Sequence, residues 1–350
     1  MSRTHLATIQ DDCCQSLADD VGQLKALRSA TLLVTGGTGF VGTWIAEMVA
    51  FLNDHHHFNI QLTLLSSRAS DFAAYMPHLA DRSFVTLVEQ DVKNLADISP
   101  ATDWIIHAAA SPDSRAHFSN PVRTLQTIVN GTHSVLDAAS RLSSLQRILC
   151  LSSGLVSGPQ QWESSPIKED RYSGLDCTSL ANLYVESKRA AEMEIVSYRS
   201  QFGLPVVIAR PFTFAGPYQH LDRPWAINNF LSEALRGGPI RVQGNGDTIR
   251  SYMYGSDAAF WLLRLLVSGK IGKAYNVGSP VGISLKNLAS KLAIHAASRP
   301  VIELNTLPDG HIASTRWLPD VTLAEKDCGV NIRIDLDEAI RRTIAWHSPR

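Results

Sequence analysis

Short apolar runs alternate with amphipathic stretches along the first two thirds of the chain. Between these runs, residues 40–53, 120–141 and 180–202 repeat apolar side chains at helical spacing. The runs themselves predict buried strands at Thr31–Thr35, Ile60–Leu65, Phe84–Val88, Trp104–Ile106, Arg147–Leu151 and Val206–Ala209. Such an alternation predicts an α/β fold with a doubly wound parallel sheet that is covered by helices on both faces.

The pattern loosens after Pro211 into segments separated by glycine and proline. Helices are predicted near 224–236, 255–268, 284–297 and 335–346, and short strands at Ile240–Val242 and Ala274–Val277. We expect a helical extension over residues 1–30, a sheet domain over 31–210 and a substrate-binding lobe over 211–350, interleaved with the last elements of the sheet. Such a lobe covers the carboxyl ends of the strands, where open α/β sheets bind ligands.

Composition narrows the classes of partner. The chain has 350 residues, of which 45% are apolar, and its 32 basic and 33 acidic side chains leave a formal net charge of −1. We therefore expect a sizeable core and no affinity for nucleic acid or for a membrane surface. Five cysteines without a CxxC pair favour a reducing, cytoplasmic location. The run His55-His56-His57 lacks the spacing of a metal site, so no metal is expected.

A glycine-rich turn follows the first predicted strand. Its sequence is Thr35-Gly36-Gly37-Thr38-Gly39-Phe40-Val41-Gly42, and a helix is predicted to start within it. Gly36 permits a tight turn, Gly39 lets the backbone approach a pyrophosphate, and Gly42 allows close packing of helix and strand. The helix N-terminus favours an anion. The turn therefore indicates a dinucleotide site, although the same residues also suit a plain strand-to-helix corner.

A second pattern lies in the predicted helix over 180–202, where Tyr184 and Lys188 are four residues apart. This step places the phenol and the ammonium group on one helix face. A phenol with its usual pKa of about 10 is a poor base at neutral pH, but the positive charges of Lys188 and of an oxidised nicotinamide favour the phenolate. Ser153, just past a predicted strand, adds a hydroxyl that can share the proton exchanged by Tyr184.

The chain carries three features in the order glycine turn, Ser153 and Tyr184/Lys188 pair. With this arrangement it resembles the NAD-dependent epimerase/dehydratase family of extended short-chain dehydrogenases, over roughly residues 31–347. The resemblance implies a Rossmann-type sheet, NAD(P) as cofactor and a nucleotide-diphosphate sugar as substrate. It implies cofactor contacts from Gly36, Gly39, Phe40, Val41, Gly42, Ser66, Arg68, Asp91, Val92, Ala108, Ala109, Tyr184, Lys188 and Pro211. It implies substrate contacts from Ser153, Thr213, Asn229, Arg250 and Arg316.

Further segments resemble the family's pattern in detail. Arg250 matches the arginine that grips the nucleotide diphosphate, and a guanidinium can hold phosphate oxygens bidentately. Asn130-Gly131-Thr132 resembles a helix stretch that supports the active site. The resemblance also implies a homodimer formed through the helices at 120–141 and 180–202.

The chain departs from the family's pattern directly after Ser153. Members that dehydrate the sugar carry Thr-Asp-Glu here and sugar-acid decarboxylases usually carry a glutamate, whereas Gly154 and Leu155 cannot transfer protons. We therefore expect an epimerase that works through a 4-keto intermediate, with Ser153, Tyr184 and Lys188 as catalytic residues. The alternatives are an NADPH-dependent 4-keto-sugar reductase, a dehydratase or decarboxylase with a different acid and base, and a non-catalytic NAD(P)-binding sensor.

Two other departures concern the ligands. The second strand ends in Leu65-Ser66-Ser67-Arg68, without the acidic residue that holds the adenosine ribose. Because Arg68 can pair with a 2′-phosphate, the sequence slightly favours NADP over NAD. Thr213 stands where the family has asparagine, which puts the substrate contact at that position in question.

Overall fold

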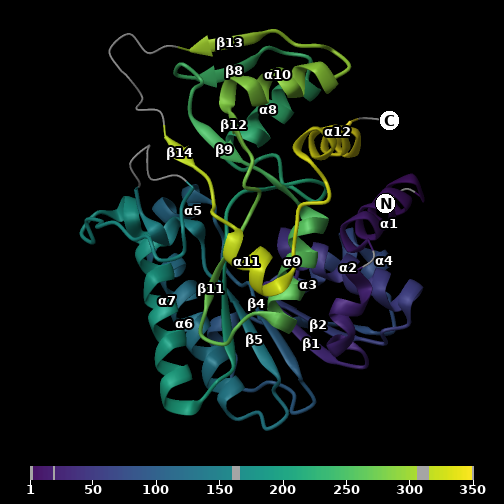
Figure 1. The fold of residues 1–350 in the computed structure, drawn as a ribbon, viewed down its shortest axis with the longest axis vertical. Coiled ribbons are helices and arrows are strands. Elements are labelled where there is room, and N and C mark those ends of the chain that lie inside the picture. The colour runs from purple at the N-terminus through teal and green to yellow at the C-terminus, as the bar shows by residue number, and fades with distance from the viewer. Residues whose placement is uncertain (1–2, 19, 160–165, 306–314, 349–350) are drawn as a thin grey trace.

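The structure, a computed structural model, describes residues 3–18, 20–159, 166–305 and 315–348. At its centre are seven parallel strands in the order β11-β6-β5-β4-β1-β2-β3 (Figure 1). Their bounds are β1 Thr31–Thr35, β2 Gln61–Ser66, β3 Val85–Glu89, β4 Trp104–His107, β5 Arg147–Leu151, β6 Val206–Pro211 and β11 Ala274–Val277. The order reverses between β1 and β4, so the sheet is doubly wound, and such folds bind ligands at this switch point. The predicted fold class is confirmed.

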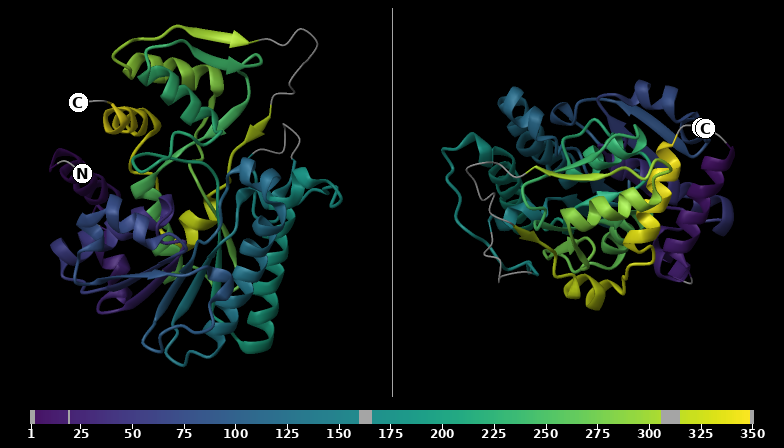
Figure 2. Two further views of the ribbon diagram at one scale, coloured as in Figure 1. Left: turned by 180° about the vertical axis from the view of Figure 1, so that it is seen from behind. Right: turned by 90° about the horizontal axis from the view of Figure 1, so that it is seen from above.

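Helices cover both faces of this sheet because its central strands are buried on both sides. Helices α2 (Phe40–His56) and α9 (Gly255–Ser268) pack together on one face. Helices α6 (Pro121–Ser140) and α7 (Leu183–Phe202) pack together on the other, at the opposite side of the sheet in Figures 1 and 2. The smaller helices of this half are α3 Ala69–Tyr75, α4 Pro77–Ala80 and α5 Ser114–Ser119, with single 3₁₀ turns at Val92–Asn94, Gly154–Ser157 and Leu180–Asn182.

A smaller lobe lies beyond the carboxyl ends of the strands, at the top of Figure 1. Its helices are α8 Ala226–Leu235, α10 Leu285–His295 and α12 Leu336–His347, and α11 Thr322–Cys328 returns beside the sheet. Its strands are β7 Phe214–Ala215, β8 Ile240–Gln243, β9 Ile249–Ser251, β10 Met253–Tyr254, β12 Gly282–Ser284, β13 Ile302–Asn305 and β14 Arg316–Trp317. These strands form three small sheets, β10-β7, β12-β9-β14 and β13-β8. A separate apolar core joins α8, α10 and α12.

The N-terminal segment is part of the main core. Helix α1 (Arg3–Leu17) packs on α2 and α9, and a 3₁₀ segment at Asp20–Leu27 packs on α9. Leu17, Leu24 and Leu27 are fully buried in the same apolar cluster as the sheet. Helices α1 and α12 lie side by side in Figures 1 and 2, so the first and last helices of the chain are neighbours.

Polar groups buried under α1 connect it to the lobe. The carboxylate of Asp12 accepts hydrogen bonds from the Tyr254 hydroxyl, at 2.7 Å, and from the Arg342 guanidinium. Burial raises the pKa of Asp12 to about 6, although both partners oppose this shift. Ser16 donates to Asp257 at 2.6 Å, and Asp257 also accepts two backbone N–H groups. None of the helices in the described ranges is long and apolar enough to cross a membrane.

Candidate active site

The glycine turn between β1 and α2 has the geometry of a phosphate cradle. Gly36 has a φ of +68°, and a Cβ there would lie 2.7 Å from the carbonyl oxygen of Ala108. A Cβ on Gly42 would collide with the carbonyl of Gly37, so a side chain fits at neither position. Helix α2 starts at Phe40, directly after Gly39, and leaves the amides of its first turn available to an anion. These residues therefore fit the pyrophosphate of a dinucleotide.

The ends of β2 and β3 form the next part of the site. Ser66 ends β2, and its hydroxyl accepts from the Thr38 hydroxyl at 2.6 Å and from the Arg68 backbone N–H at 3.2 Å. The Arg68 side chain is exposed. Beyond β3, the Asp91 carboxylate accepts the backbone N–H of Lys93 at 3.1 Å and so caps a short turn. Ser66, Arg68 and Asp91 thus form a polar edge beside the glycine turn, to which the Thr38 hydroxyl connects it.

Behind the cradle, a buried histidine has a defined proton arrangement. The Thr132 hydroxyl donates to the carbonyl of Ile128 at 2.7 Å, so its oxygen accepts from His107 Nε2 at 3.1 Å. His107 Nδ1 then accepts from the Thr35 hydroxyl at 2.7 Å. Burial and the charge of Lys188 lower the pKa of His107 to about 3. His107 is therefore neutral at physiological pH and ties β1, β4 and α6 together without adding charge to the site.

Ser153, Tyr184 and Lys188 converge at the carboxyl end of β5. Each of them is less than one tenth exposed. The Leu155 backbone N–H donates to Ser153 Oγ at 3.2 Å, which leaves the serine hydrogen for its bond to the Tyr184 phenol. Lys188 Nζ donates to the carbonyl of Leu151, the last residue of β5, at 2.7 Å. The structure thus brings together the three predicted catalytic residues from β5 and α7.

Burial sets the protonation states of this group. It raises the pKa of Tyr184 to about 12, and the hydrogen bond from Ser153 acts in the opposite direction. Burial lowers the pKa of Lys188 to about 8, against the attraction of Cys150 and Glu192. At neutral pH the phenol is therefore protonated and most of the lysine is charged. Ionisation of Tyr184 requires further positive charge beside it.

The position after Ser153 is closed by an aromatic ring. A Cβ on Gly154 would lie 2.5 Å from Cε2 of Phe212 and less than 3 Å from two further ring atoms. The next side chain, Leu155, is 43% exposed. Phe212 thus occupies the space into which a side chain at Gly154 would point, and neither position supplies a proton donor or acceptor.

Two arginines predicted to bind substrate lie on adjacent strands of the lobe. Arg250 on β9 donates to the Thr315 hydroxyl at 2.9 Å and to the carbonyl of Ile249 at 2.8 Å. Arg316 on β14 is paired in register with Ile249, and its buried Nε has no partner in the described part of the chain. Thr213 lies two residues after Pro211, the last residue of β6, and its carbonyl accepts the backbone N–H of Met253 at 3.0 Å. Arg250 and Arg316 therefore present guanidinium groups that an anion can use.

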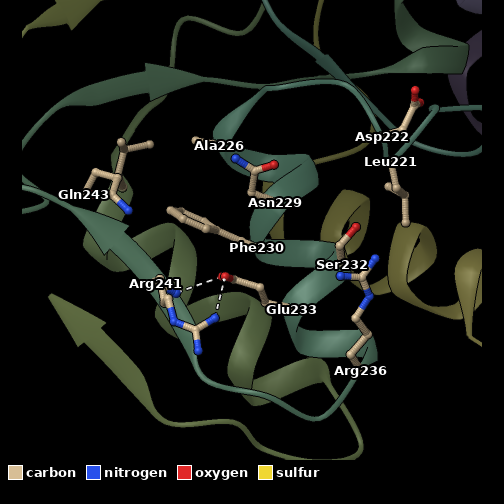
Figure 3. A pocket seen from close by; sticks show the side chains of 11 residues that line it. Leu221, Asp222, Ala226, Asn229, Phe230, Ser232, Glu233, Arg236, Arg241 and Gln243 are labelled. Carbon is tan, nitrogen blue, oxygen red and sulfur yellow. Dashed lines mark hydrogen bonds and ion pairs between the residues drawn. The ribbon is translucent and has the colours of Figure 1, made fainter. Parts of the chain in front are cut away.

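Asn229 lines a cavity of about 470 Å³ in the same lobe (Figure 3). Phe230 and Gln243 lie on its wall, from α8 and β8. Glu233 and Arg241 form a hydrogen-bonded pair at its edge, drawn as dashed lines in Figure 3, and the backbone N–H of Arg241 donates to Glu233 at 2.8 Å. The cavity is thus lined by apolar, amide and charged side chains.

One segment named from the sequence lies beside the site, and the structure adds one residue. In Asn130-Gly131-Thr132, the Thr132 hydroxyl accepts from His107 while Asn130 is exposed on α6, and Ile128, two positions before Asn130, packs against Tyr184. The imidazole of His117 on α5 stacks on the Tyr184 ring, with 4.7 Å between ring centroids. This contact has no signal in the sequence, because the two residues lie on different elements and belong to no common spacing pattern.

These features define a class of protein: a doubly wound dinucleotide-binding fold with a Ser–Tyr–Lys group at the end of the sheet. The model of the NAD dependent epimerase/dehydratase family matches residues 32–278. UDP-glucuronic acid decarboxylase 1 of Danio rerio is 29% identical over 317 residues, which are 91% of this chain and 72% of that protein. The chain belongs to the NAD dependent epimerase/dehydratase family, and it is an enzyme of that family.

Solved structures resemble the fold over most of its length. The epimerase Mth375 of Methanothermobacter thermautotrophicus superposes with a TM-score of 0.78 at 21% identity, over 94% of this chain and 95% of that one. The Bordetella bronchiseptica enzyme WbmF in complex with NAD+ and UDP gives a TM-score of 0.74 at 20% identity, over 92% and 93% of the two chains. At these identities the similarity concerns the fold alone.

Proposed function

We propose that this protein is a nucleotide-sugar 4-epimerase that oxidises the sugar's 4-hydroxyl and then reduces the ketone from the opposite face. The observation that supports this proposal most directly is the surroundings of Ser153. A buried Tyr184 and Lys188 adjoin it, while Gly154 and Phe212 fill the neighbouring space with groups that transfer no proton. Epimerisation needs one acid/base residue, whereas dehydration needs an additional acid and an additional base.

Tyr184 is the acid and base of the proposed reaction. Its phenolate takes the proton of the sugar 4-hydroxyl, and Ser153 donates a hydrogen bond to the phenolate oxygen. Lys188 lies one helical turn further along α7, on the same face of the helix as Tyr184. A bound nicotinamide dinucleotide supplies reversible hydride transfer and, when oxidised, further positive charge. Tyr184 then returns the proton to the ketone oxygen.

The lobe supplies the proposed contacts to the rest of the substrate. Arg250 and Arg316 on β9 and β14 hold the diphosphate, since both guanidinium groups are free of carboxylate partners within the described residues. Asn229 and the other residues lining the cavity between α8 and β8 receive the nucleotide base. WbmF, which shares the fold, is a protein whose complex with NAD+ and UDP has been solved.

Sugar-acid decarboxylation is the second candidate. It is favoured by the relatives, since the Danio rerio protein of 29% identity is named UDP-glucuronic acid decarboxylase 1. Oxidation at C4, with Tyr184 as the base and the nicotinamide dinucleotide as the hydride acceptor, would turn a 5-carboxylate into a β-keto acid, which loses carbon dioxide without a dedicated base. This route requires a proton donor for C5, and neither Gly154 nor Leu155 provides one.

The two candidates are separated by their products. The protein is incubated with NAD+ or NADP+, in parallel, and either UDP-glucose or UDP-glucuronic acid, and the sugar is analysed by NMR. We expect the 4-epimer without net formation of the reduced cofactor, and no product from the variant Tyr184→Phe. Release of carbon dioxide and a UDP-pentose would favour the decarboxylase instead, and an active Tyr184→Phe would refute both mechanisms.

The cofactor and the oligomeric state are further parts of the proposal. The exposed Arg68, with Ser66 in place of an acidic residue, supports a preference for NADP over NAD. Exposed apolar side chains on the outer sides of α6 and α7 support a homodimer in which these helices pack against a second copy. They are Val122, Leu125, Met193 and Val196, each more than 40% exposed.

A further inference from the structure

Two aromatic rings lie between the catalytic residues and the lobe strand β9, which carries Arg250. Phe212 directly follows β6, and Trp317 ends β14; their ring centroids are 6.0 Å apart and the ring planes differ by 34°. Both residues are only partly buried, so each ring keeps surface that a ligand can contact. Strand β14 lies where the lobe meets the sheet domain in Figures 1 and 2. No step of the proposed reaction gives either ring a contact with the sugar.

At one end of this pair, Phe212 adjoins the catalytic group. A Cβ on Gly154 would lie 2.5 Å from Cε2 of the Phe212 ring, and the preceding residue, Ser153, is hydrogen-bonded to Tyr184. Gly278 packs closely against the root of the Phe212 side chain, because a Cβ there would lie 3.0 Å from the Cβ of Phe212. Phe212 is therefore a fixed surface beside the groups that exchange the proton.

At the other end, Trp317 adjoins Arg250. The two residues are register partners in the parallel pair of β14 and β9, and such partners project from the same face of a sheet. Arg250 is held by hydrogen bonds to the Thr315 hydroxyl at 2.9 Å and to the carbonyl of Ile249 at 2.8 Å. The indole of Trp317 and the guanidinium proposed to hold the diphosphate thus start side by side.

A sugar that connects these two ends must pass the rings. With its diphosphate at Arg250 and its 4-hydroxyl at Tyr184, a nucleotide-diphosphate hexose has its pyranose ring between them, where Phe212 and Trp317 lie. The C–H groups of a pyranose can pack on flat aromatic side chains, which offer a large and rigid contact area. This contact has no fixed hydrogen-bond direction. It therefore suits a ketone that presents first one face and then the other for reduction.

We propose that Phe212 and Trp317 form the platform on which the hexose ring of the substrate packs, and that this platform selects a neutral sugar. The positions of the 4-hydroxyl and the diphosphate come from the proposed function, on which this inference rests. Two residues outside the acid/base group thereby decide which sugars reach Tyr184.

The selection of a neutral sugar follows from the charges around the rings. Within the described residues, no guanidinium or ammonium group lies over the face of either ring. Lys188 is engaged by the carbonyl of Leu151 at 2.7 Å, and Arg250 is occupied by the diphosphate in the proposed complex. A sugar carboxylate placed against the rings would lose its hydration without gaining a cation, which is unfavourable. A hexuronic acid should therefore bind less tightly than a hexose.

Binding measurements on the protein with its cofactor test the platform without turnover. Calorimetry compares UDP with UDP-glucose in the Tyr184→Phe variant, with NAD+ or NADP+ present, so that the difference between the two ligands reports the contact with the sugar. The test substitution is Trp317→Leu, and Trp317→Phe restores an aromatic ring. Trp346→Leu is the matched control, because Trp346 is also partly buried and contacts an aromatic ring, that of Tyr218, at 5.0 Å between centroids, but lies on α12.

We expect Trp317→Leu to weaken the binding of UDP-glucose by about five- to ten-fold and to change the binding of UDP by less than about two-fold. Trp317→Phe should recover most of the lost affinity, and Trp346→Leu should leave both ligands unaffected. With Tyr184 restored, the loss of kcat/KM in Trp317→Leu should come mainly from a higher KM for UDP-glucose. UDP-glucuronic acid should bind the Tyr184→Phe variant about ten-fold more weakly than UDP-glucose does.

Three results would overturn separate parts of this inference. Equal losses for UDP and UDP-glucose in Trp317→Leu would show that the indole does not contact the sugar, while the proposed function would stand. Binding of UDP-glucuronic acid as tight as that of UDP-glucose would refute the selection of a neutral sugar. If the Tyr184→Phe variant binds neither UDP nor UDP-glucose, the proposed function is wrong and the platform with it. Should Trp317→Leu not fold, Phe212→Leu takes its place in the same comparison, because it keeps an apolar side chain beside Gly154.

Discussion

The contact between Gly154 and Phe212 allows a quantitative test of how the active site is closed. The backbone of Gly154 has no positive φ, so Ala is compatible with its conformation and only the added Cβ matters. That Cβ would lie 2.5, 2.7 and 2.8 Å from three atoms of the Phe212 ring. Carbon atoms in contact prefer about 3.5–4.0 Å, so the ring must move by roughly 1 Å.

The ring has little room to move. It lies 6.0 Å from the ring of Trp317, between centroids, and its Cβ is against Gly278. Overpacking of this kind costs about 1–3 kcal/mol. We therefore expect Gly154→Ala to lower the free energy of unfolding by that amount. The variant Gly174→Ala is the matched control, because no heavy atom lies within 4 Å of its added Cβ.

Equilibrium unfolding in urea checks this prediction through a double-mutant cycle. Phe212→Ala removes the ring and should be destabilising by itself, yet adding Gly154→Ala to it should cost close to nothing. The coupling energy between the two positions should thus approach the full cost of Gly154→Ala, within the usual range of about 0.5–3 kcal/mol for residues in contact. An equal cost of Gly154→Ala in both backgrounds would refute the view that Phe212 fills this space.

Three further predictions concern stability, cofactor and assembly. The pKa of Asp12 is about 6 when folded against 3.8 as a free side chain, so its stabilising contribution is complete well below pH 3.8 and is lost as pH rises through 6. Urea unfolding should show the wild type losing about 2 kcal/mol relative to Asp12→Asn from pH 4 to pH 7, and parallel curves would contradict this prediction. Arg68→Ala should weaken NADP binding by about ten-fold in fluorescence titration and leave NAD binding unchanged; equal losses for both would argue against a 2′-phosphate contact. Met193→Asp should convert a dimer into a monomer in light scattering, and an unchanged mass would exclude this helix pair as the interface.

The fold class was predictable because its signals are local. Strands buried on both faces are continuous apolar runs, and helices between them repeat with a period near 3.6 residues. The glycine turn was predictable for a similar reason. Gly36 has a positive φ and Gly42 has no space for a side chain, so both positions require glycine, and both glycines lie in one short segment of the sequence. The Tyr184/Lys188 pair lies on a single helix, so its spacing was sufficient to place both groups on one face.

Contacts between distant elements left no such local signal. Phe212 and Gly154 are close only because β5 and β6 are neighbours in the sheet, and His117 reaches Tyr184 only because α5 packs beside α6 and α7. The segment Asn130-Gly131-Thr132 illustrates this limit, because the rotation of α6 turns Thr132 toward His107 and leaves Asn130 exposed.

The sequence by itself thus determined the doubly wound sheet, the cofactor cradle and the identity of the residues Ser153, Tyr184 and Lys188, because backbone conformation and helix periodicity depend on near neighbours. Only the tertiary structure decided the burial that shifts the pKa values of Tyr184 and Lys188, the ring that closes Gly154 and the stacking of His117. Desolvation and packing depend on every element that surrounds a group, and the chain brings those elements together only when it folds.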